Sequence, residues 1–151
     1  MRKTGFPEPM VSAYILDDEG RLLLAKPLKG SPHRLSVPSA HVELGESATE
    51  ALKRTVYEST GMRVRATRLL AVHEDIFPEG YRGKRHFILL EFLCRPSGGS
   101  PRNPGKSVWI KPAEALRQKG IGATKQTLKL LSMDGYEPRI PLELERRILK
   151  R

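Results

Sequence analysis

The residue best placed for metal chemistry in this sequence is Glu58, in the stretch from Pro38 to Met62. A helix is predicted from about Ala48 to Thr60, and at 100° per residue its buried face is a narrow stripe. Glu58 lies at the rim of that stripe, and carboxylate oxygens are the ligands that Mg²⁺ prefers. We therefore consider Glu58 a candidate ligand for a divalent cation.

Two hydroxyl residues, Thr55 and Ser59, are predicted to point inward in the same stripe, beside Leu52 and Val56. Carboxylates at these two positions would be costly to bury unless cations neutralised them. A hydroxyl there can instead donate to the carbonyl four residues back. The pair is typical of a helix face that does not have to hold a metal.

Both ends of this helix are marked in the sequence. Ser47 and Glu50 have the spacing of a capping box, in which each side chain accepts from the backbone amide of the other. Gly61 is suited to end the helix in the left-handed conformation. A loop, a helix and a sharp stop are therefore predicted around Glu58.

The same stretch resembles the Nudix box of the MutT-like hydrolases. The family pattern is G-x5-E-x7-R-E-U-x-E-E-x-G-U, where U is a bulky aliphatic residue, and here it spans Ala40 to Met62. The residues that match are Glu46, Arg54, Val56, Glu58, Gly61 and Met62. The resemblance extends on both sides of the box, to Pro38, Val42-Glu43, Gly45-Glu46-Ser47, Glu50-Ala51-Leu52, Ser107 to Ile110, Pro112, Glu114 and Leu116.

The resemblance implies a site for Mg²⁺ or Mn²⁺. Its metal ligands would be Glu58, Glu46 and Glu43, and its catalytic residues Glu58, Glu46 and Arg54. Glu46 is expected to be either a second ligand or the partner that orients Arg54.

The box also departs from the family pattern. Thr55 and Ser59 stand where the family has glutamates, and Ser39 and Ala40 stand where it has two glycines. Since the missing carboxylates hold metal in the family, weaker metal binding is expected.

Two functions are therefore open. The first is a metal-dependent hydrolase of a nucleoside diphosphate linked to another moiety, attenuated by the loss of two carboxylates. The second is a catalytically inactive Nudix-fold module that binds a nucleotide or RNA. The retained box residues favour the first, and Thr55 and Ser59 favour the second.

A glutamate from outside the box often completes the site in this family, and the candidates here are Glu74, Glu79 and Glu91. Glu74 and Glu79 are expected at the surface. Glu91 lies in an apolar strand, where a carboxylate needs a partner or a site. The four histidines are scattered and predict no structural metal centre.

Positive charge predicts the class of ligand. The net charge of +10 favours polyanionic partners, and much of it lies in predicted loops. Arg34 and His41 near the box, and Tyr81 and Arg85 before the apolar strand, are expected to bind substrate, with Tyr81 or Phe77 stacking on a base. The expected partner is a nucleotide or another diphosphate-containing small molecule, with RNA as a further candidate.

Composition favours one globular domain over residues 1–151, and the family resemblance implies a core at about 10–131. No stretch has the roughly 20 apolar residues of a membrane helix, and no signal peptide is recognised, so a cytoplasmic protein without a membrane partner is expected. Cys94, the only cysteine, is expected to be a core residue. The family resemblance alone makes a homodimer a further expectation.

The remaining elements predict an α/β class. Two strands, Val11 to Leu16 and Arg21 to Ala25, are expected to form a hairpin about Gly20. Later strands are predicted at Arg63 to Leu69, Arg85 to Cys94 and Lys106 to Ile110, with a flexible loop at Pro96 to Lys106. Helices are predicted at Pro112 to Gln118, Thr124 to Leu131 and Pro141 to Lys150. These pieces make a mixed β-sheet between helices, which is also the α/β/α sandwich that the resemblance implies.

Overall fold

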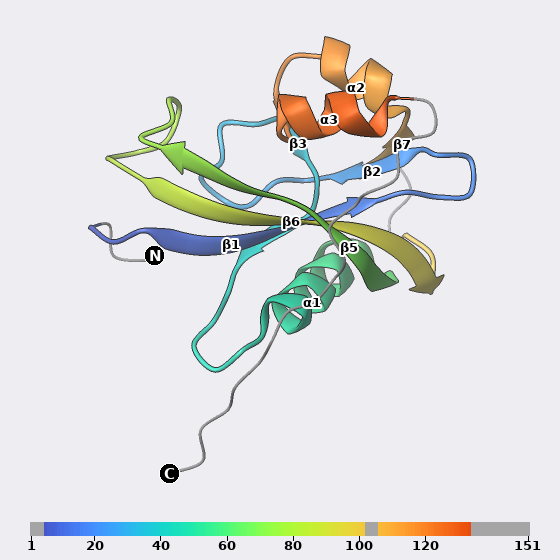
Figure 1. Cartoon of the computed structure of the whole chain (residues 1–151), viewed down its shortest axis with the longest axis horizontal. Helices are drawn as coiled ribbons and strands as arrows, with labels where there is room; N and C mark the ends of the chain where they lie inside the picture. The colour runs from blue at the N-terminus through green and yellow to red at the C-terminus, as the bar shows by residue number, and fades with distance from the viewer. Residues whose placement is uncertain (1–4, 102–105, 134–151) are drawn as a thin grey trace.

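The protein builds its strands into two four-stranded sheets, with helices on both sides of them (Figure 1). The computed structural model describes residues 5–101 and 106–133. In Figure 1, α1 (Ala48–Thr60) lies below the strands, and α2 (Pro112–Arg117) and α3 (Lys125–Leu131) lie above them. The predicted α/β class is confirmed, although the strands divide between two sheets where one was expected.

The first sheet is mixed and has the strand order β4-β1-β6-β5. It contains β1 (Glu8–Ile15), β4 (Ser39–His41), β5 (Arg63–Ile76) and β6 (His86–Gly98). β1 runs parallel to β6, whereas the outer strands β4 and β5 are antiparallel to their neighbours. β6, which includes most of the strand predicted at Arg85 to Cys94, lies in the interior of this sheet.

The second sheet has the order β7-β2-β3-β8 and consists of short strands. They are β2 (Leu22–Ala25), β3 (Leu35–Ser36), β7 (Ser107–Ile110) and β8 (Ile121–Gly122). Pro112 occupies the first turn of α2, as predicted. Thr124 holds the N-cap position of α3, but its side chain makes no capping hydrogen bond.

Three sequence predictions about strands need correction. β1 and β2 are joined by a turn at Gly20, which has a φ of 75°, but they enter different sheets and share only the bridge between Leu16 and Leu22. β5 continues past Leu69 to Ile76. β6 continues to Gly98, into the segment predicted as a flexible loop, because Val64 and Arg63 of β5 pair with Pro96 and Gly98.

α1 forms where the sequence predicts it. The Ser47 hydroxyl accepts from the Glu50 amide at 3.1 Å, and Glu50 accepts from the Ser47 amide at 3.0 Å, so the capping box is complete. Gly61 ends the helix with a φ of 78° and donates its amide to the Tyr57 carbonyl. Local signals therefore fix both ends of the helix.

β1 separates two hydrophobic clusters because successive side chains of a strand point to opposite faces. Val11, Ala13 and Ile15 join the cluster that packs against α1 through Leu52 and Val56. Tyr14 belongs to the other cluster, which reaches α2 and α3 through Ala115 and Leu128. Cys94 is fully buried in the first cluster, and burial raises the pKa of its thiol to about 12.

The predicted helix from Pro141 to Lys150 lies outside the described residues. Within residues 5–101 and 106–133, no helix is long and apolar enough to cross a membrane.

Candidate functional site

A cavity of about 680 Å³ lies over the first sheet. Its floor consists of alternate residues of neighbouring strands, since every second side chain of a strand points to the same face. Pairing places Met10 beside Leu89 and Ser12 beside Glu91. The residues of β1, β5 and β6 that line the cavity are Met10, Ser12, Tyr14, His73, Asp75, Phe87, Leu89 and Glu91.

The rest of the wall comes from loops and from α1. The basic loop from Lys26 to Arg34 contributes Lys26, Lys29 and His33. α1 contributes Thr55, Glu58 and Ser59. The Nudix-like helix and the basic loop therefore face one space, although they are separate in the sequence.

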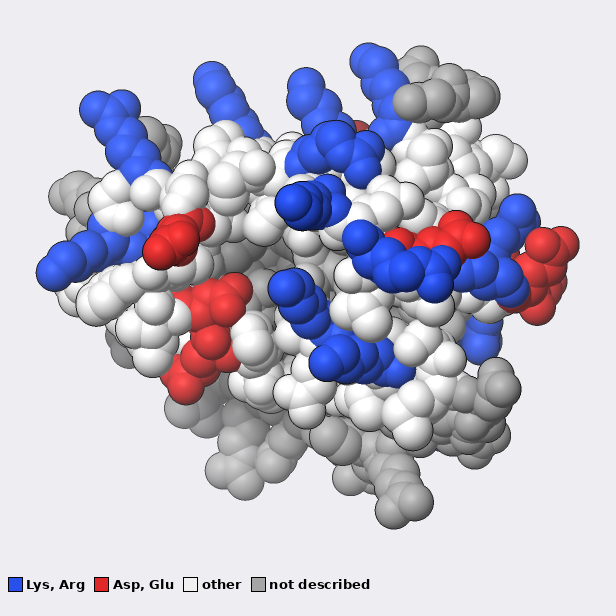
Figure 2. All heavy atoms as spheres, turned by 90° about the horizontal axis from the view of Figure 1, so that it is seen from above, with Lys and Arg blue, Asp and Glu red and all other residues white. Residues whose placement is uncertain are grey.

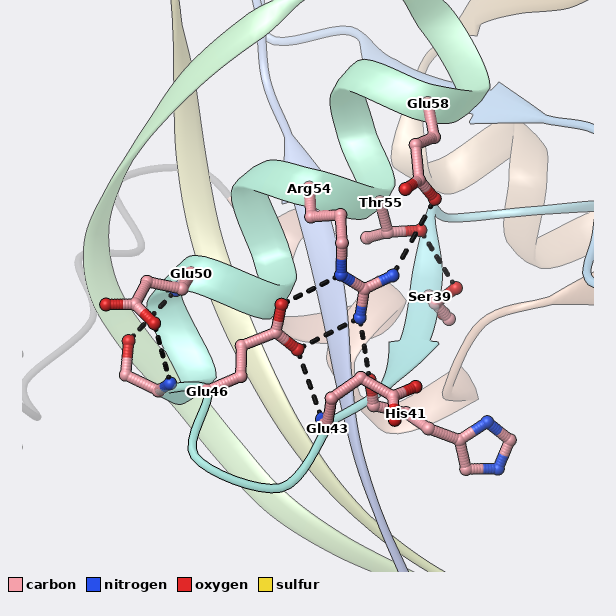
Figure 3. A network of polar contacts seen from close by, with 9 residues as sticks. Ser39, His41, Glu43, Glu46, Glu50, Arg54, Thr55 and Glu58 are labelled. Atoms are coloured by element: carbon pink, nitrogen blue, oxygen red, sulfur yellow. Dashed lines mark hydrogen bonds and ion pairs between the residues drawn. The ribbon is translucent and has the colours of Figure 1, made fainter. Parts of the chain in front are cut away.

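Glu46 and Arg54 form a two-pronged ion pair in the box (Figure 3). The Arg54 Nε donates to Glu46 Oε2 at 2.8 Å, and Nη2 donates to Oε1 at 3.0 Å. Oε1 also accepts from the Glu43 amide at 3.1 Å. Hydrogen bonds from Arg54 lower the pKa of Glu46. Of the two roles expected for Glu46, this geometry favours the orienting partner of Arg54.

Arg54 also links the helix to β4. Its Nη2 donates to the carbonyl of His41 at 3.0 Å, and in Figure 3 the ring of His41 points away from Arg54. Its Nη1 lies 3.6 Å from an oxygen of Glu58. The Glu58 side chain is 64% exposed and lines the cavity.

Thr55 and Ser59 are satisfied within the protein, but differently from each other. Thr55 is buried as predicted, yet its hydroxyl donates to the Ser39 carbonyl at 3.1 Å, on the neighbouring strand β4. Ser59 donates to the carbonyl of Thr55, four residues back, at 2.7 Å. The prediction that Ser59 is buried is wrong: it is exposed, because the helix turns this position toward the cavity.

The predicted substrate-binding residues do not all meet. His41, Tyr81 and Arg85 line the cavity. Arg34 does not: its Nη2 donates to Gln118 at 3.0 Å, on the α2 side. Phe77, proposed as an alternative stacking residue, is 58% exposed and also lies outside the cavity lining.

Tyr81 belongs to an aromatic cluster at the cavity wall. Its ring meets the Phe87 ring edge to face, with 5.1 Å between centroids, and the His33 ring at 6.4 Å. The Arg85 guanidinium lies 5.1 Å from the centroid of the Phe87 ring. Aromatic and cationic groups therefore border the same part of the cavity.

The three candidate glutamates outside the box differ clearly in burial. Glu91 is 1% exposed at the cavity floor, and its carboxylate accepts from the hydroxyls of Tyr14 and Thr127. A buried carboxylate needs hydrogen-bond donors of this kind, so the burial of Glu91 is explained. Glu74 lies 3.4 Å from His86, and Glu79 is exposed.

Sequence reasoning missed one residue of this site, Glu8. It is 5% exposed, and its carboxylate contacts both Arg85 and His41. The available signal was alternation, because Glu8, Met10, Ser12 and Tyr14 lie on one face of β1.

The donor set for a metal is sparse. Among the residues that the structure describes, no group of three or more His, Cys, Asp or Glu side chains could hold a metal ion. Glu58 is the box carboxylate that faces the cavity. Mg²⁺ is commonly held by one or two carboxylates together with substrate phosphates and water, and Glu58 fits that limited role.

Lys and Arg side chains are the commonest charged groups on the face seen in Figure 2. Lys and Arg side chains spread over it and gather toward its middle, whereas Asp and Glu lie mainly at its two sides. An approaching polyanion would be attracted to this face.

Comparison with known proteins points to the same family as the box residues. The NUDIX domain family matches residues 7–131, and the chain belongs to this family. The predicted resemblance is confirmed. Hydrolases of this family act on nucleotide-linked substrates and generally use a divalent metal.

Individual relatives agree with that assignment. A MutT-like protein of Streptomyces ambofaciens is 28% identical over 134 residues, which cover 86% of this chain and 79% of the relative. The structure of a NUDIX hydrolase from Nitrosomonas europaea is similar with a TM-score of 0.74 and 19% identity, over 95% of this chain and 98% of that one. A MutT NUDIX hydrolase from Burkholderia pseudomallei is similar with a TM-score of 0.66 and 25% identity, over 83% and 98%.

Proposed function

We propose that this protein hydrolyses a nucleoside diphosphate linked to another moiety, with Mg²⁺ or Mn²⁺, at a rate that the loss of two box carboxylates reduces. The observation that carries the proposal is that Glu58 lines the same cavity as Tyr81 and Arg85. A carboxylate for the cation, a cationic group for phosphate and an aromatic ring for a base thus border one space.

In this proposal Glu58 holds the cation, and Glu43, next to the box helix, is a supporting acid. When bound, the cation would offset negative charge on the phosphates and favour attack of water on a phosphorus of the P-O-P bridge. Glu46 has both oxygens engaged by Arg54, so its part is to hold Arg54 in place. Thr55 and Ser59 add no carboxylate, which accounts for the expected attenuation.

Arg85, His41 and Tyr81 bind the substrate in this proposal. Arg85 and His41 would donate to phosphate oxygens, and Tyr81 would contact the base. Glu91 is not assigned the role of general base, because both of its oxygens accept hydrogen bonds from buried hydroxyls.

A second candidate function is a nucleotide-binding or RNA-binding module without catalysis. The observation that favours it is the self-sufficiency of the box: Thr55 and Ser59 donate to backbone carbonyls, and Glu46 pairs with Arg54. None of these groups requires a metal to be satisfied.

One assay separates the two functions. Phosphate-product release is measured on nucleoside diphosphate sugars, dinucleotides, nucleoside triphosphates and capped RNA, with Mg²⁺ or Mn²⁺. Glu58→Gln is compared with the matched variant Glu114→Gln, at an exposed glutamate of α2 that lies outside the cavity lining.

Turnover by the wild type that Glu58→Gln abolishes and Glu114→Gln retains supports the hydrolase. Equal turnover by wild type and Glu58→Gln contradicts the role of Glu58. If the wild type turns over no substrate but binds one of them, the binding module replaces the hydrolase.

A further inference from the structure

Glu8 is a buried carboxylate at the beginning of β1, beside the cavity. Its side chain is 6% exposed. β1 places it on the same face as Met10 and Ser12, which line the cavity floor. Burying a carboxylate is costly unless it is paired and hydrogen-bonded, so the partners of Glu8 show what its burial achieves.

Those partners are two of the cavity-lining groups. Arg85 donates from Nε to Oε2 at 2.7 Å and from Nη2 to Oε1 at 2.6 Å. The His41 Nε2 lies 2.9 Å from the same Oε1. The Glu8 carboxylate thus fixes the relative position of the Arg85 guanidinium, just before β6, and the His41 imidazole, on β4.

We propose that Glu8 is a positioning residue that holds Arg85 and His41 as a binding pair for the diphosphate group in the cavity. The inference rests on the proposed function, since it assigns the part of the site that recognises the P-O-P bridge. Neither the box nor any motif of the sequence includes Glu8.

The geometry leaves Arg85 able to bind an anion. A guanidinium has five N–H donors, and Glu8 occupies two of them. A cation–π contact with the Phe87 ring, 5.1 Å from its centroid, also restrains the guanidinium. A donor that is already fixed loses less conformational entropy on binding, which is how preorganisation raises affinity.

Glu8 also acts on His41. Hydrogen bonds from Arg85 lower the pKa of Glu8, so the carboxylate is ionised at neutral pH and only accepts hydrogen bonds. The His41 Nε2 therefore carries a proton and donates to Glu8, and the ring can donate to phosphate only when Nδ1 is protonated as well. The orientation of the ring and the state of that nitrogen are set by the same carboxylate.

A role in stability alone explains the Glu8–Arg85 ion pair less well than positioning does. β1 and β6 already pair over the whole range from Glu8 to Ile15, so this ion pair is not needed to join them. Buried ion pairs are also weak evidence for stability, because desolvation offsets much of their attraction. Orientation of the two cavity groups is the consequence that remains.

Binding of inorganic pyrophosphate tests the inference, because charge and positioning predict opposite signs. Glu8→Gln removes a negative charge near the cavity, so charge alone would tighten pyrophosphate binding. Loss of positioning would weaken it, and we expect a loss of about tenfold in affinity. The measurement is calorimetric titration with pyrophosphate and, separately, with phosphate.

Two further comparisons make the test specific. In an Arg85→Gln background, Glu8→Gln should cause a smaller loss than in the wild type, because only its action on His41 remains. The preference for pyrophosphate over phosphate should fall in Glu8→Gln, whereas general damage to the fold would weaken both ligands alike. Asp17→Asn is the matched control, since Asp17 pairs with Arg21 at 2.8 Å outside the cavity lining and should leave both affinities unchanged.

If Glu8→Gln does not fold, Arg85→Lys provides the test, because it keeps the charge but loses the two-pronged bond. It should lose the preference for pyrophosphate as well. Unchanged or tighter pyrophosphate binding in Glu8→Gln, additive losses in the double variant, or no pyrophosphate binding by the wild type would each overturn the inference. The hydrolase proposal is decided separately, by the turnover assay with Glu58→Gln.

Discussion

Glu46 and Arg54 are joined by two parallel hydrogen bonds, at 2.8 and 3.0 Å, across the loop that precedes α1. Because Arg54 also donates to the His41 carbonyl, this one guanidinium connects the loop, the helix and β4 (Figure 3). The pair therefore sets where the box helix sits relative to the cavity.

Glu46→Gln should lower the free energy of unfolding, because a partly buried charged hydrogen-bond pair is lost. The expected loss is about 1–3 kcal/mol, measured by urea denaturation at pH 7. Glu114→Gln is the control and should change stability by less than about 0.5 kcal/mol. Equal stability of Glu46→Gln and wild type would show that the pair does not hold the loop.

The same pair gives a pH dependence with a definite sign. The hydrogen bonds from Arg54 hold the pKa of Glu46 below its ordinary value of 4.5. The stability that the carboxylate contributes is therefore present above pH 4.5 and is lost as the pH falls through the lowered folded-state pKa. The difference in stability between wild type and Glu46→Gln should shrink as the pH is lowered from about 5 to about 3. A difference that stays constant would contradict this linkage.

Much of this local arrangement could be predicted from sequence, because its signals are close together in the chain. Ser47, Glu50 and Gly61 determine the ends of α1 through backbone bonds within a few residues. The hairpin prediction failed because strand pairing depends on contacts that the turn residues do not specify. A turn with Gly20 reports that the chain reverses, but not whether the flanking strands stay paired or enter different sheets.

Long-range partners were beyond sequence reasoning. Glu8 and Arg85 are separated by 77 positions, and only the parallel pairing of β1 with β6 brings them together. The burial of Ser59 was mispredicted because periodicity defines a stripe on a helix but not what covers each part of it. Both residues line the cavity, but Thr55 is buried against β4, whereas Ser59 is exposed.

Restoring the two box carboxylates should create a metal site. Thr55→Glu with Ser59→Glu is expected to raise affinity for Mn²⁺ and Mg²⁺, because both added groups join Glu58 on one face of α1. Without metal, the double variant should be less stable than wild type, since Thr55 is 6% exposed and a charge there is buried.

Two measurements check this variant, calorimetric titration with Mn²⁺ and the midpoint of thermal unfolding with and without Mn²⁺. Metal should raise the midpoint of the double variant and have little effect on Lys53→Glu, which adds a carboxylate at an exposed position of the same helix. An absence of gain in affinity would count against the placement of Thr55 and Ser59 as former ligand positions.

Tyr14→Phe should destabilise the protein through the floor of the cavity. The Tyr14 hydroxyl contacts the Glu91 carboxylate and accepts from the Thr124 amide at 2.9 Å. Without the hydroxyl, the Glu91 carboxylate and the Thr124 amide each lose a hydrogen-bond partner. The free energy of unfolding should fall by about 1–3 kcal/mol. Tyr57→Phe, at a more exposed tyrosine of α1, is the matched control and should cost less than Tyr14→Phe. Similar unfolding midpoints for the two variants in urea would show that the hydroxyl does not support β1 and α3.

Nucleotide binding should weaken with salt, because cationic side chains border the cavity. Lys26, Lys29 and Arg85 all line it, and exposed charges are screened over about 8 Å at physiological ionic strength. The affinity for a nucleoside diphosphate should fall severalfold between about 50 and 500 mM KCl. Replacing Lys26 and Lys29 with Gln should reduce that dependence, whereas Lys53→Gln on the exposed side of α1 should not. An affinity that does not respond to salt in the wild type would mean that the ligand is held by its base and not by its phosphates.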